Sequence, residues 1–314
     1  MWGPLVRRGR VPLSRERVPT ADGDFVDLDW LPGPAAAPLV LVLHGLEGSA
    51  GSHYVTGLLR HVRARGWRGV ALNFRSCGGE PNRLPRFYHS GDTGDLDTVV
   101  KLLVAREAGL HLGAVGVSIG GNVLLKWLGE RETDVPKQLA AAVAISVPFD
   151  LAACARVLDR GLRRAVYTEN FMRTLRRKVL DKERRFPGFV DVDAAWRART
   201  FAEYDRVVTA PLHGFADALD YWTRASSGPY LGRIRRPTLL INARDDPFVP
   251  PETLPDPRTL PAGVVTEFVP CGGHAGFVEG PPWRSRSWAE RRAVEFLTSA
   301  GSLTTRRGVA PDAT

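Results

Sequence analysis

The sequence predicts an α/β fold, with a mainly parallel central sheet covered on both faces by helices. Two observations lead to this prediction. Short apolar segments typical of buried strands recur along the chain, and they alternate with stretches in which apolar residues follow helical spacing. The length of 314 residues exceeds the usual size of one domain, but it suits a single α/β core that carries an insertion.

The sequence predicts an edge hairpin followed by six strands of a parallel sheet. An antiparallel edge hairpin is predicted between Glu16 and Trp30, with its turn at Asp22 and Gly23. The parallel part of the sheet is expected from six apolar segments: residues 39–43, 69–74, 112–117, 140–147, 237–242 and 264–269. A helix is predicted from about Asn122, and Gly129 is suited to cap its C-terminal end.

The alternation of strands and helices is interrupted between Phe149 and about Gly232. Within this interval, apolar residues at helical spacing predict helices over residues 151–162 and 166–180. We therefore expect one domain over residues 1–314, with a helical cap inserted at residues 150–232. Such a cap would lie over the active face, exclude water and shape a pocket.

A serine between a predicted strand and a predicted helix is the strongest functional signal in the chain. Ser118 lies in the pentapeptide Gly116-Val-Ser-Ile-Gly120, directly after an apolar strand. A nucleophile on such a sharp turn needs small residues on both sides, and the two glycines meet this need. A glycine-rich turn without function is the alternative for so short a motif, so the interpretation depends on partner residues elsewhere.

A serine hydroxyl needs a histidine to take its proton and an acid to orient that histidine. When the serine comes first in the chain, the acid and the histidine are expected after two late strands. His274 follows the last predicted strand and lies between glycines, and Asp245 and Asp246 follow the strand before it. We expect Asp246 to orient His274, because a proline bends the loop directly after it. Asp245 would cap the turn or pair with Arg244, although spacing alone leaves a swap of the two acids open.

The negative charge that develops on a substrate carbonyl needs backbone N–H donors. One is expected from the residue after the nucleophile, Ile119, and the other from a loop after an early strand. The strand at 39–43 ends in His44 and Gly45, so Leu46 N–H is the second expected donor; an ordinary turn is the alternative there. We expect the other histidines to be surface or core residues: His44, His53, His61, His89, His111 and His213.

Together, these motifs resemble the YheT-like branch of the α/β-hydrolases, a group of esterases that also includes eukaryotic ABHD-type lipid hydrolases. The matching stretches lie between about residue 20 and residue 298, at 44–48, 73–83, 88–91, 116–122, 209–214, 245–248 and 272–277. The resemblance implies an α/β-hydrolase fold with Ser118 as nucleophile, Asp246 as acid and His274 as base. It also implies esters of medium acyl chain or lipid origin as substrates.

The expected function is therefore that of a serine hydrolase, which cleaves carboxylic esters of short to medium chain or of lipid origin through an acyl-enzyme. Thioesters and amides stay open as substrates of the same three residues, and a non-catalytic binding protein on the same scaffold is the alternative. The chemistry requires no metal and no organic cofactor, so none is expected.

A long loop over residues 75–91 follows the strand at 69–74, at the edge where α/β sheets place their sites. Its polar side chains could bind a polar substrate group or brace the loop through ion pairs and turns, and we favour bracing. The residues concerned are Arg75, Glu80, Asn82, Arg83, Tyr88 and His89.

Positive charge exceeds negative charge by nine, and the excess is concentrated at residues 156–185 of the expected cap. It could steer anionic substrates or bring the protein to acidic lipid headgroups, and a solvated helix face is the simpler alternative. Nucleic acid is not expected as a partner, because no aromatic-interleaved basic motif and no zinc-ligand spacing accompanies the charge.

Three cysteines without a Cys-x-x-Cys pair argue against a disulfide framework and favour a reducing compartment. Cys271 lies near His274 in the sequence, but the turn motif belongs to Ser118. Residues 1–10 are basic and lack the apolar core of a secretory signal, and no later segment is apolar enough to span a bilayer. We therefore expect a cytoplasmic protein.

Overall fold

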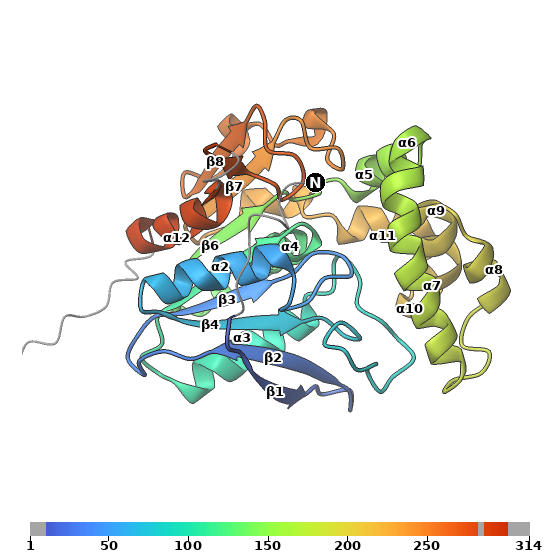
Figure 1. Ribbon diagram of the computed structural model, residues 1–314, viewed down its shortest axis with the longest axis horizontal. Coiled ribbons are helices and arrows are strands. Elements are labelled where there is room, and N and C mark those ends of the chain that lie inside the picture. Colours follow the sequence, from blue (N-terminus) through green and yellow to red (C-terminus); the bar gives the residue numbers. More distant parts are fainter. Residues whose placement is uncertain (1–10, 282–285, 301–314) are drawn as a thin grey trace, which may run out of the picture.

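The computed structural model describes residues 11–281 and 286–300, so the expectation about residues 1–10 lies outside the described residues. An eight-stranded sheet runs through the molecule in the order β1-β2-β4-β3-β5-β6-β7-β8 (Figure 1). The strands are β1 (Ser14–Pro19), β2 (Phe25–Leu31), β3 (Leu39–Leu43), β4 (Arg68–Asn73), β5 (Leu112–Val117), β6 (Leu139–Ile145), β7 (Thr238–Ala243) and β8 (Val264–Val269). Strands β3 to β8 pair in parallel, and β2 is antiparallel to both β1 and β4. The predicted α/β fold with an antiparallel edge hairpin is therefore confirmed.

Helices cover both faces of this sheet. Helices α2 (His53–Ala64) and α12 (Trp288–Ala300) contribute to the apolar core on one face. Helices α3 (Gly94–Arg106) and α4 (Ile119–Arg131) contribute to the core on the other, and η1 (Glu132–Asp134) follows α4. The short strands β9 (Val278–Glu279) and β10 (Arg286–Ser287) form a separate pair.

Strand β3 shows why helices must cover both faces of the sheet. Leu39, Leu41 and Leu43 belong to the core under α3 and α4, whereas Val40 and Val42 belong to the core under α2 and α12. This alternation follows from the two-residue period of a strand. A strand that is apolar on both faces is stable only in the centre of a sheet, and this is where β3 lies.

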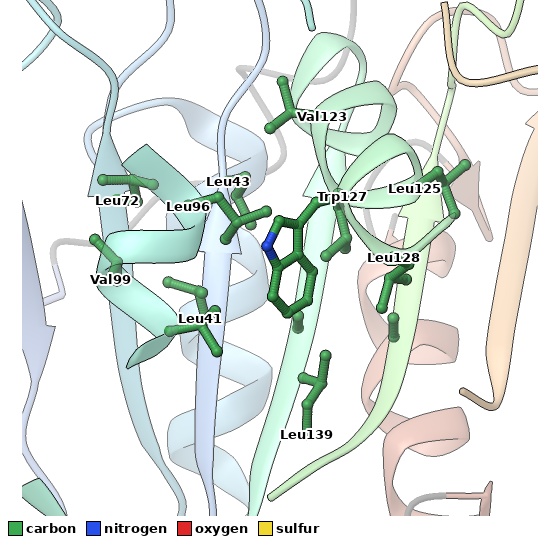
Figure 2. Packing of buried hydrophobic residues seen from close by; sticks show 14 of the residues in the cluster. Leu41, Leu43, Leu72, Leu96, Val99, Val123, Leu125, Trp127, Leu128 and Leu139 are labelled. Atoms are coloured by element: carbon green, nitrogen blue, oxygen red, sulfur yellow. The ribbon is translucent and has the colours of Figure 1, made fainter. Parts of the chain in front are cut away.

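Trp127 of α4 fills the centre of the core on the first face. Figure 2 shows its indole ring among leucine side chains, with Leu41 and Leu96 on one side and Leu139 below. The indole N–H donates to Asp97 Oδ1 of α3 at 3.0 Å, so the buried polar atom is satisfied. Trp127 therefore ties α4 to its neighbour and fixes the helix that begins after Ser118.

Helix α4 differs from its prediction at its end. The helix passes through Gly129 and ends at Arg131, so the predicted glycine cap is wrong. A Cβ atom at Gly129 would collide with the carbonyl oxygen of Tyr230. The glycine is needed for the close approach of α4 to the segment η4 (Gly228–Arg233), a tertiary contact that helical spacing cannot reveal.

Strand β6 also ends earlier than predicted, at Ile145 instead of residue 147. Ser146 has a φ of 54°, which leaves the extended conformation. The next N–H, that of Val147, donates to the side chain of Asn242 in β7 at 3.1 Å instead of to a backbone carbonyl of that strand.

Between β6 and β7 the chain leaves the sheet and forms a helical segment, residues 150–232, which lies at one side of the molecule in Figure 1. Its elements have an apolar core of their own that includes Met172, Val179 and Tyr204. They are α5 (Leu151–Leu158), α6 (Gly161–Arg163), η2 (Arg164–Thr168), α7 (Glu169–Glu183), α8 (Val192–Arg197), α9 (Phe201–Tyr204), η3 (Asp205–Thr209), α10 (Ala210–His213), α11 (Ala218–Ala225) and η4.

The first predicted helix of this segment stops four residues early. Helix α5 ends at Leu158, because Arg160 has an extended backbone with φ −121° and ψ 147°. The carboxylate of Asp159 turns away to accept hydrogen bonds from the N–H groups of Phe201 and Ala202 at 2.8 and 3.1 Å. The chain then resumes a helical path from Gly161, through η2, to the end of α7 at Glu183.

Candidate active site

Ser118 lies between β5 and α4 with a φ of 56° and a ψ of −125°, a backbone conformation that is strained for any residue other than glycine. A Cβ atom at Gly116 would collide with the carbonyl oxygen of Gly120, and one at Gly120 would collide with that of His44. Both glycines of the motif are therefore required by the close approach of strand, turn and loop. The strand, turn and helix around the serine stand in the predicted order.

The structure brings the three residues singled out from the sequence into hydrogen-bond contact. His274 Nε2 lies 3.0 Å from Ser118 Oγ. On the other side of the same ring, Nδ1 lies 2.8 Å from Asp246 Oδ2 and 3.1 Å from Oδ1. A proton on Nδ1 faces the carboxylate, so Nε2 is left as an acceptor toward the serine hydroxyl. This arrangement can accept a proton from the serine as its oxygen attacks a carbonyl carbon.

Asp245 lies elsewhere and makes different contacts. Its Oδ1 accepts hydrogen bonds from the N–H groups of Gly272 and Gly273 at 2.8 and 2.9 Å. It therefore holds the loop that carries His274, instead of capping its own turn or pairing with Arg244 as expected. The two neighbouring carboxylates thus have different contacts at one site. Asp246 accepts from the imidazole of His274, and Asp245 accepts from the backbone of the loop before it.

Phe248 is a site residue that the sequence interpretation missed. Its ring stacks on the imidazole of His274, with centroids 4.1 Å apart and an interplanar angle of 18°. Its backbone N–H donates to Asp246 Oδ1 at 2.8 Å. One residue therefore contacts both partners of the serine. Its place in the sequence, two residues after Asp246, could have indicated this contact. The sequence interpretation considered that loop only in choosing between Asp245 and Asp246.

The loop after β3 lies directly against the serine. A Cβ atom at Gly45 would be 3.1 Å from Ser118 Cβ, so no larger residue fits there without a shift. The ring of His44 holds this loop: Nδ1 donates to Gly45 O at 2.7 Å, and Nε2 accepts from Phe74 N at 3.1 Å. Burial lowers the pKa of His44 to about 4, so the ring is neutral, as these two hydrogen bonds require. Leu46 follows next and lines the same cavity as Ile119.

Glu47 and Lys178, which the sequence interpretation missed, form contacts in and beside the loop after β3. Glu47 has a φ of 55°, and its N–H donates to Tyr88 Oη at 2.8 Å. Tyr88 Oη in turn donates to Glu47 Oε1 at 3.0 Å. The ammonium of Lys178, from α7 of the helical segment, reaches the same carboxylate oxygen at 2.6 Å. The ion pair joins the helical segment to the loop beside Ser118.

A cavity of about 560 Å³ opens onto Ser118 and His274. Loops after β3, β5, β7 and β8 form its floor, and the helical segment supplies most of its walls. This position at the carboxyl ends of parallel strands is where open α/β sheets bind ligands. The walls are mostly apolar and include Phe87, Leu151, Ala155, Leu158, Phe171, Leu175, Phe201 and Trp222.

One part of the cavity lining is polar but uncharged between about pH 3 and pH 7. The rings of His89 and His213 lie 4.6 Å apart, and burial lowers the pKa of each to about 3. Asp205 is also buried in the lining, where its carboxylate accepts from Thr209 Oγ1 at 2.6 Å and from Trp222 Nε1 at 2.8 Å. Burial raises the pKa of Asp205 to about 7 despite these hydrogen bonds.

Among the polar side chains of the loop at residues 75–91, some brace the loop, as favoured from the sequence, and others line the cavity. Arg75 and Asn82 are buried in contacts with Asp22, Asp24 and Asp95, which brace the loop. Glu80 pairs with Arg17, and Arg83 does not line the cavity. Tyr88 and His89, in contrast, do line it.

Within residues 11–281 and 286–300, no group of three or more His, Cys, Asp or Glu side chains is arranged to hold a metal ion. Among the helices of the same ranges, none has both the length and the hydropathy that crossing a lipid bilayer requires.

Comparison with solved structures shows the fold. An esterase of Pyrococcus furiosus, Pf2001, superposes with a TM-score of 0.59 at 18% identity, over 93% of this chain and 94% of the esterase. The α/β hydrolase GrgF from a Penicillium species superposes with a TM-score of 0.61 at 16% identity, over 93% of this chain and 99% of GrgF.

Comparison with known sequences shows the family. A family model described as alpha/beta hydrolase fold matches residues 38–281. YheT of Escherichia coli strain K12, a protein whose name assigns it provisionally as an esterase, is 40% identical over 90% of this chain and 84% of its own length. Phospholipase ABHD3 of mouse is 31% identical over 91% of this chain and 72% of its own length. The chain therefore belongs to the α/β-hydrolase family, in the branch that contains YheT and ABHD3.

Proposed function

We propose that this chain is a serine hydrolase that cleaves carboxylic esters through an acyl-enzyme. Membership of a family whose relatives are named esterase, phospholipase and monoacylglycerol lipase supports the cleavage of ester bonds. The single observation that carries the proposal is the chain of contacts from Ser118 Oγ through the imidazole of His274 to Asp246.

In the proposed reaction, His274 Nε2 takes the hydroxyl proton of Ser118 as Oγ attacks the ester carbonyl carbon. The carbonyl oxygen becomes negative and is bound by the N–H groups of Leu46 and Ile119. The imidazolium, held by Asp246, then gives its proton to the leaving alcohol as the carbon–oxygen bond breaks. A water molecule repeats the same steps on the acyl-enzyme, which releases the acid and restores Ser118.

The helical segment at residues 150–232 acts in this proposal as a cap inserted within one domain. It supplies apolar walls around the serine, which suits an acyl chain and removes water from the reacting atoms. A cavity of about 560 Å³ fits short- to medium-chain esters or part of a lipid-derived ester. The reaction uses only groups of the chain itself and water.

The first experiment treats the folded protein with a fluorophosphonate probe and measures turnover of p-nitrophenyl esters of graded chain length. We expect labelling at Ser118, and Ser118→Ala should lose labelling and at least about a thousandfold in kcat. Cys271→Ala serves as the matched control, because this exposed thiol near His274 should be dispensable. Unlabelled wild-type protein, or equal turnover by Ser118→Ala, would exclude catalysis by this serine and favour a binding protein on the same scaffold.

Thioesters and amides are the second class of substrate to test, since the same groups can attack any acyl carbonyl. Matched acyl groups carried on oxygen, sulfur and nitrogen leaving groups separate the three. We expect kcat/KM to be highest for the ester, and a higher value for the thioester would move the assignment to a thioesterase.

A further inference from the structure

One surface of the helical segment carries side chains that the proposed reaction does not use. At the start of the helical path from α6 to α7, Leu162 is 80% exposed and Val166 is 47% exposed. They lie one helical turn apart, so they form a small apolar spot in water. In Figure 1, α6 stands at an outer end of the helical segment, away from the sheet.

Cationic side chains accompany this apolar spot. Arg156, Arg160 and Arg163 are exposed, and none of the three forms an ion pair with another residue in the part of the chain that the structure describes. Their charge is therefore not neutralised within the described structure. We call residues 156–166 the α6 tip.

The same helical path has a second face that looks into the cavity. Phe171, Thr174 and Lys178 line the cavity, whereas Leu162 and Val166 face solvent. The helical path from α6 to α7 therefore has two distinct faces. One face lines the cavity, and the other exposes apolar and basic side chains to solvent.

Aromatic contacts connect the α6 tip with the reacting residues. The ring of Tyr167, next to Val166, lies 4.8 Å from the ring of Phe248. Phe248 in turn stacks on His274 at 4.1 Å. The exposed spot thus lies two aromatic contacts from the imidazole, near one wall of the cavity.

We propose that the α6 tip docks on the surface of a membrane that contains anionic lipids. Leu162 and Val166 enter the interface, while the arginines meet the phosphates of the headgroups. Docking in this way brings the cavity wall toward the lipid surface, where an ester of lipid origin could enter. This last step rests on the proposed function; the docking itself does not.

The combination of groups selects this partner over other polyanions. The phosphate backbone of a nucleic acid would attract the arginines, but it offers nothing apolar to Leu162 and Val166. A lipid interface accepts both kinds of side chain at once. Binding should therefore depend on charge and on apolar area together.

The test measures co-flotation of the full chain with vesicles of phosphatidylcholine alone or mixed with phosphatidylglycerol. We expect binding to the mixed vesicles, weakened about thirtyfold by the pair Arg160→Gln and Arg163→Gln. The pair Leu162→Ser and Val166→Ser should also weaken binding. High salt should reduce binding of the wild type, because it screens the arginines.

Matched controls change the same chemistry at other exposed positions. Arg63→Gln with Lys137→Gln removes two charges far from α6 in the chain, and Leu219→Ser with Val265→Ser removes two side chains that are 58% and 45% exposed. Both controls should bind as the wild type does. All variants should keep their turnover of a water-soluble ester, because none of these residues lines the cavity.

Several outcomes would overturn the docking proposal. They are unchanged binding by the α6-tip variants, equal weakening by the controls, or binding to a single-stranded RNA that is as tight as to vesicles and insensitive to Leu162→Ser with Val166→Ser. Ser118→Ala separates the two proposals, since it should lose turnover and keep vesicle binding. A wild-type protein that binds vesicles without any esterase activity would refute the function and leave the docking in place.

Discussion

Asp245 and Asp246 are adjacent in the chain, yet their carboxylates point to different partners. Asp246 is almost fully buried and accepts from the imidazole of His274 and from Phe248 N. Asp245 is exposed and accepts from two backbone N–H groups of the loop before His274. Because each acid has a separate set of donors, the two negative charges do not compete for one imidazole. Charge at Asp246 should matter for the reaction, and only an acceptor oxygen should matter at Asp245.

This difference predicts distinct results for two matched substitutions. Asp246→Asn should lower kcat for an ester by roughly a thousandfold or more, because an amide cannot stabilise the imidazolium or fix the same tautomer. Asp245→Asn keeps an acceptor oxygen and should cost less than about tenfold in kcat. Steady-state kinetics with circular dichroism of both variants make the comparison. Equal losses in the two variants would contradict the assignment of Asp246.

Asp205 shows how burial creates a pH dependence at a cavity residue other than Ser118, Asp246 and His274. Since burial raises its pKa to about 7, the folded protein holds a proton that the unfolded chain releases near pH 4. The stability contributed by this protonated group is complete below the unfolded pKa. It is lost as the pH rises through the folded pKa of about 7.

Asp205→Asn should remove this loss, because the amide does not titrate. The free energy of unfolding of the variant minus that of the wild type should rise between pH 4 and pH 8, by at most about 4 kcal/mol. Urea unfolding at several pH values measures the difference. Asp193→Asn, at an exposed position of α8, serves as control and should give a flat difference. A flat difference for Asp205→Asn as well would show that the carboxyl titrates normally.

At the scale of elements, α7 is held to the loop beside the serine by buried polar contacts. Lys178 pairs with Glu47, which follows the expected oxyanion donor Leu46. One turn further along α7, the ammonium of Lys182 donates to the carbonyl oxygens of Asn82 and Leu84. The helix therefore supports both the loop after β3 and the loop at residues 75–91. Because these groups are shielded from water, their interactions are stronger than surface pairs.

Lys178→Met should reveal a positioning role for this ion pair. The variant leaves Glu47 without its cation, so we expect kcat for a soluble ester to fall about tenfold with a smaller change in KM. Tyr88→Phe should act in the same direction, and the two changes together should cost less than the sum of their separate effects. Lys178→Arg should restore part of the activity.

Arg177→Met is the matched control, since this neighbouring side chain is exposed on α7. It should leave kcat and KM unchanged. If Lys178→Met lowered only the midpoint of thermal unfolding and kept kcat at temperatures where it is folded, the contact would be purely structural.

At the scale of the whole molecule, Arg75 joins three parts of the chain. Its guanidinium contacts Asp22 and Asp24 at the edge hairpin and Asp95 at the start of α3. Burial alone would lower the pKa of Arg75, but Asp95 and Asp22 together hold it above its ordinary value. The same guanidinium holds the pKa of Asp22 at about 2, against the effect of its partial burial. The buried guanidinium of Arg75 thus links the edge hairpin, the loop at residues 75–91 and helix α3.

Arg75→Met should therefore destabilise the fold by about 3–5 kcal/mol, because it leaves buried carboxylates without a cation. Arg83→Ala is the control: this side chain of the same loop is exposed, and its loss should change stability by less than about 0.5 kcal/mol. Urea unfolding measures both. Arg83→Ala should also leave KM for a charged ester unchanged, and an increase in KM would revive a role for Arg83 in substrate binding.

Much of this molecule follows from local patterns in the sequence. Strand positions follow from short continuous apolar segments, because a strand covered on both faces is buried at every position. Helix positions follow from the 3.6-residue spacing of apolar residues, because only one side of a helix reaches the core. The strained turn at Ser118 follows from its two glycines. The chain order of Ser118, Asp246 and His274 predicts the contacts found between them, since each comes directly after a parallel strand and such strand ends share one edge of the sheet.

Other features depend on approaches between distant segments and have no local signal. Gly129 is needed beside Tyr230, Asp245 holds the loop before His274, and Phe248 stacks on the imidazole. The pairing of Glu47 with Lys178 likewise joins residues far apart in the chain. The sequence by itself determined the layers of the fold and the three residues that meet at the candidate site, because these depend on the apolar pattern and on the order of the strands. Only the tertiary structure decided which neighbours hold those groups and what lines the cavity, because side-chain contacts depend on how separate elements pack.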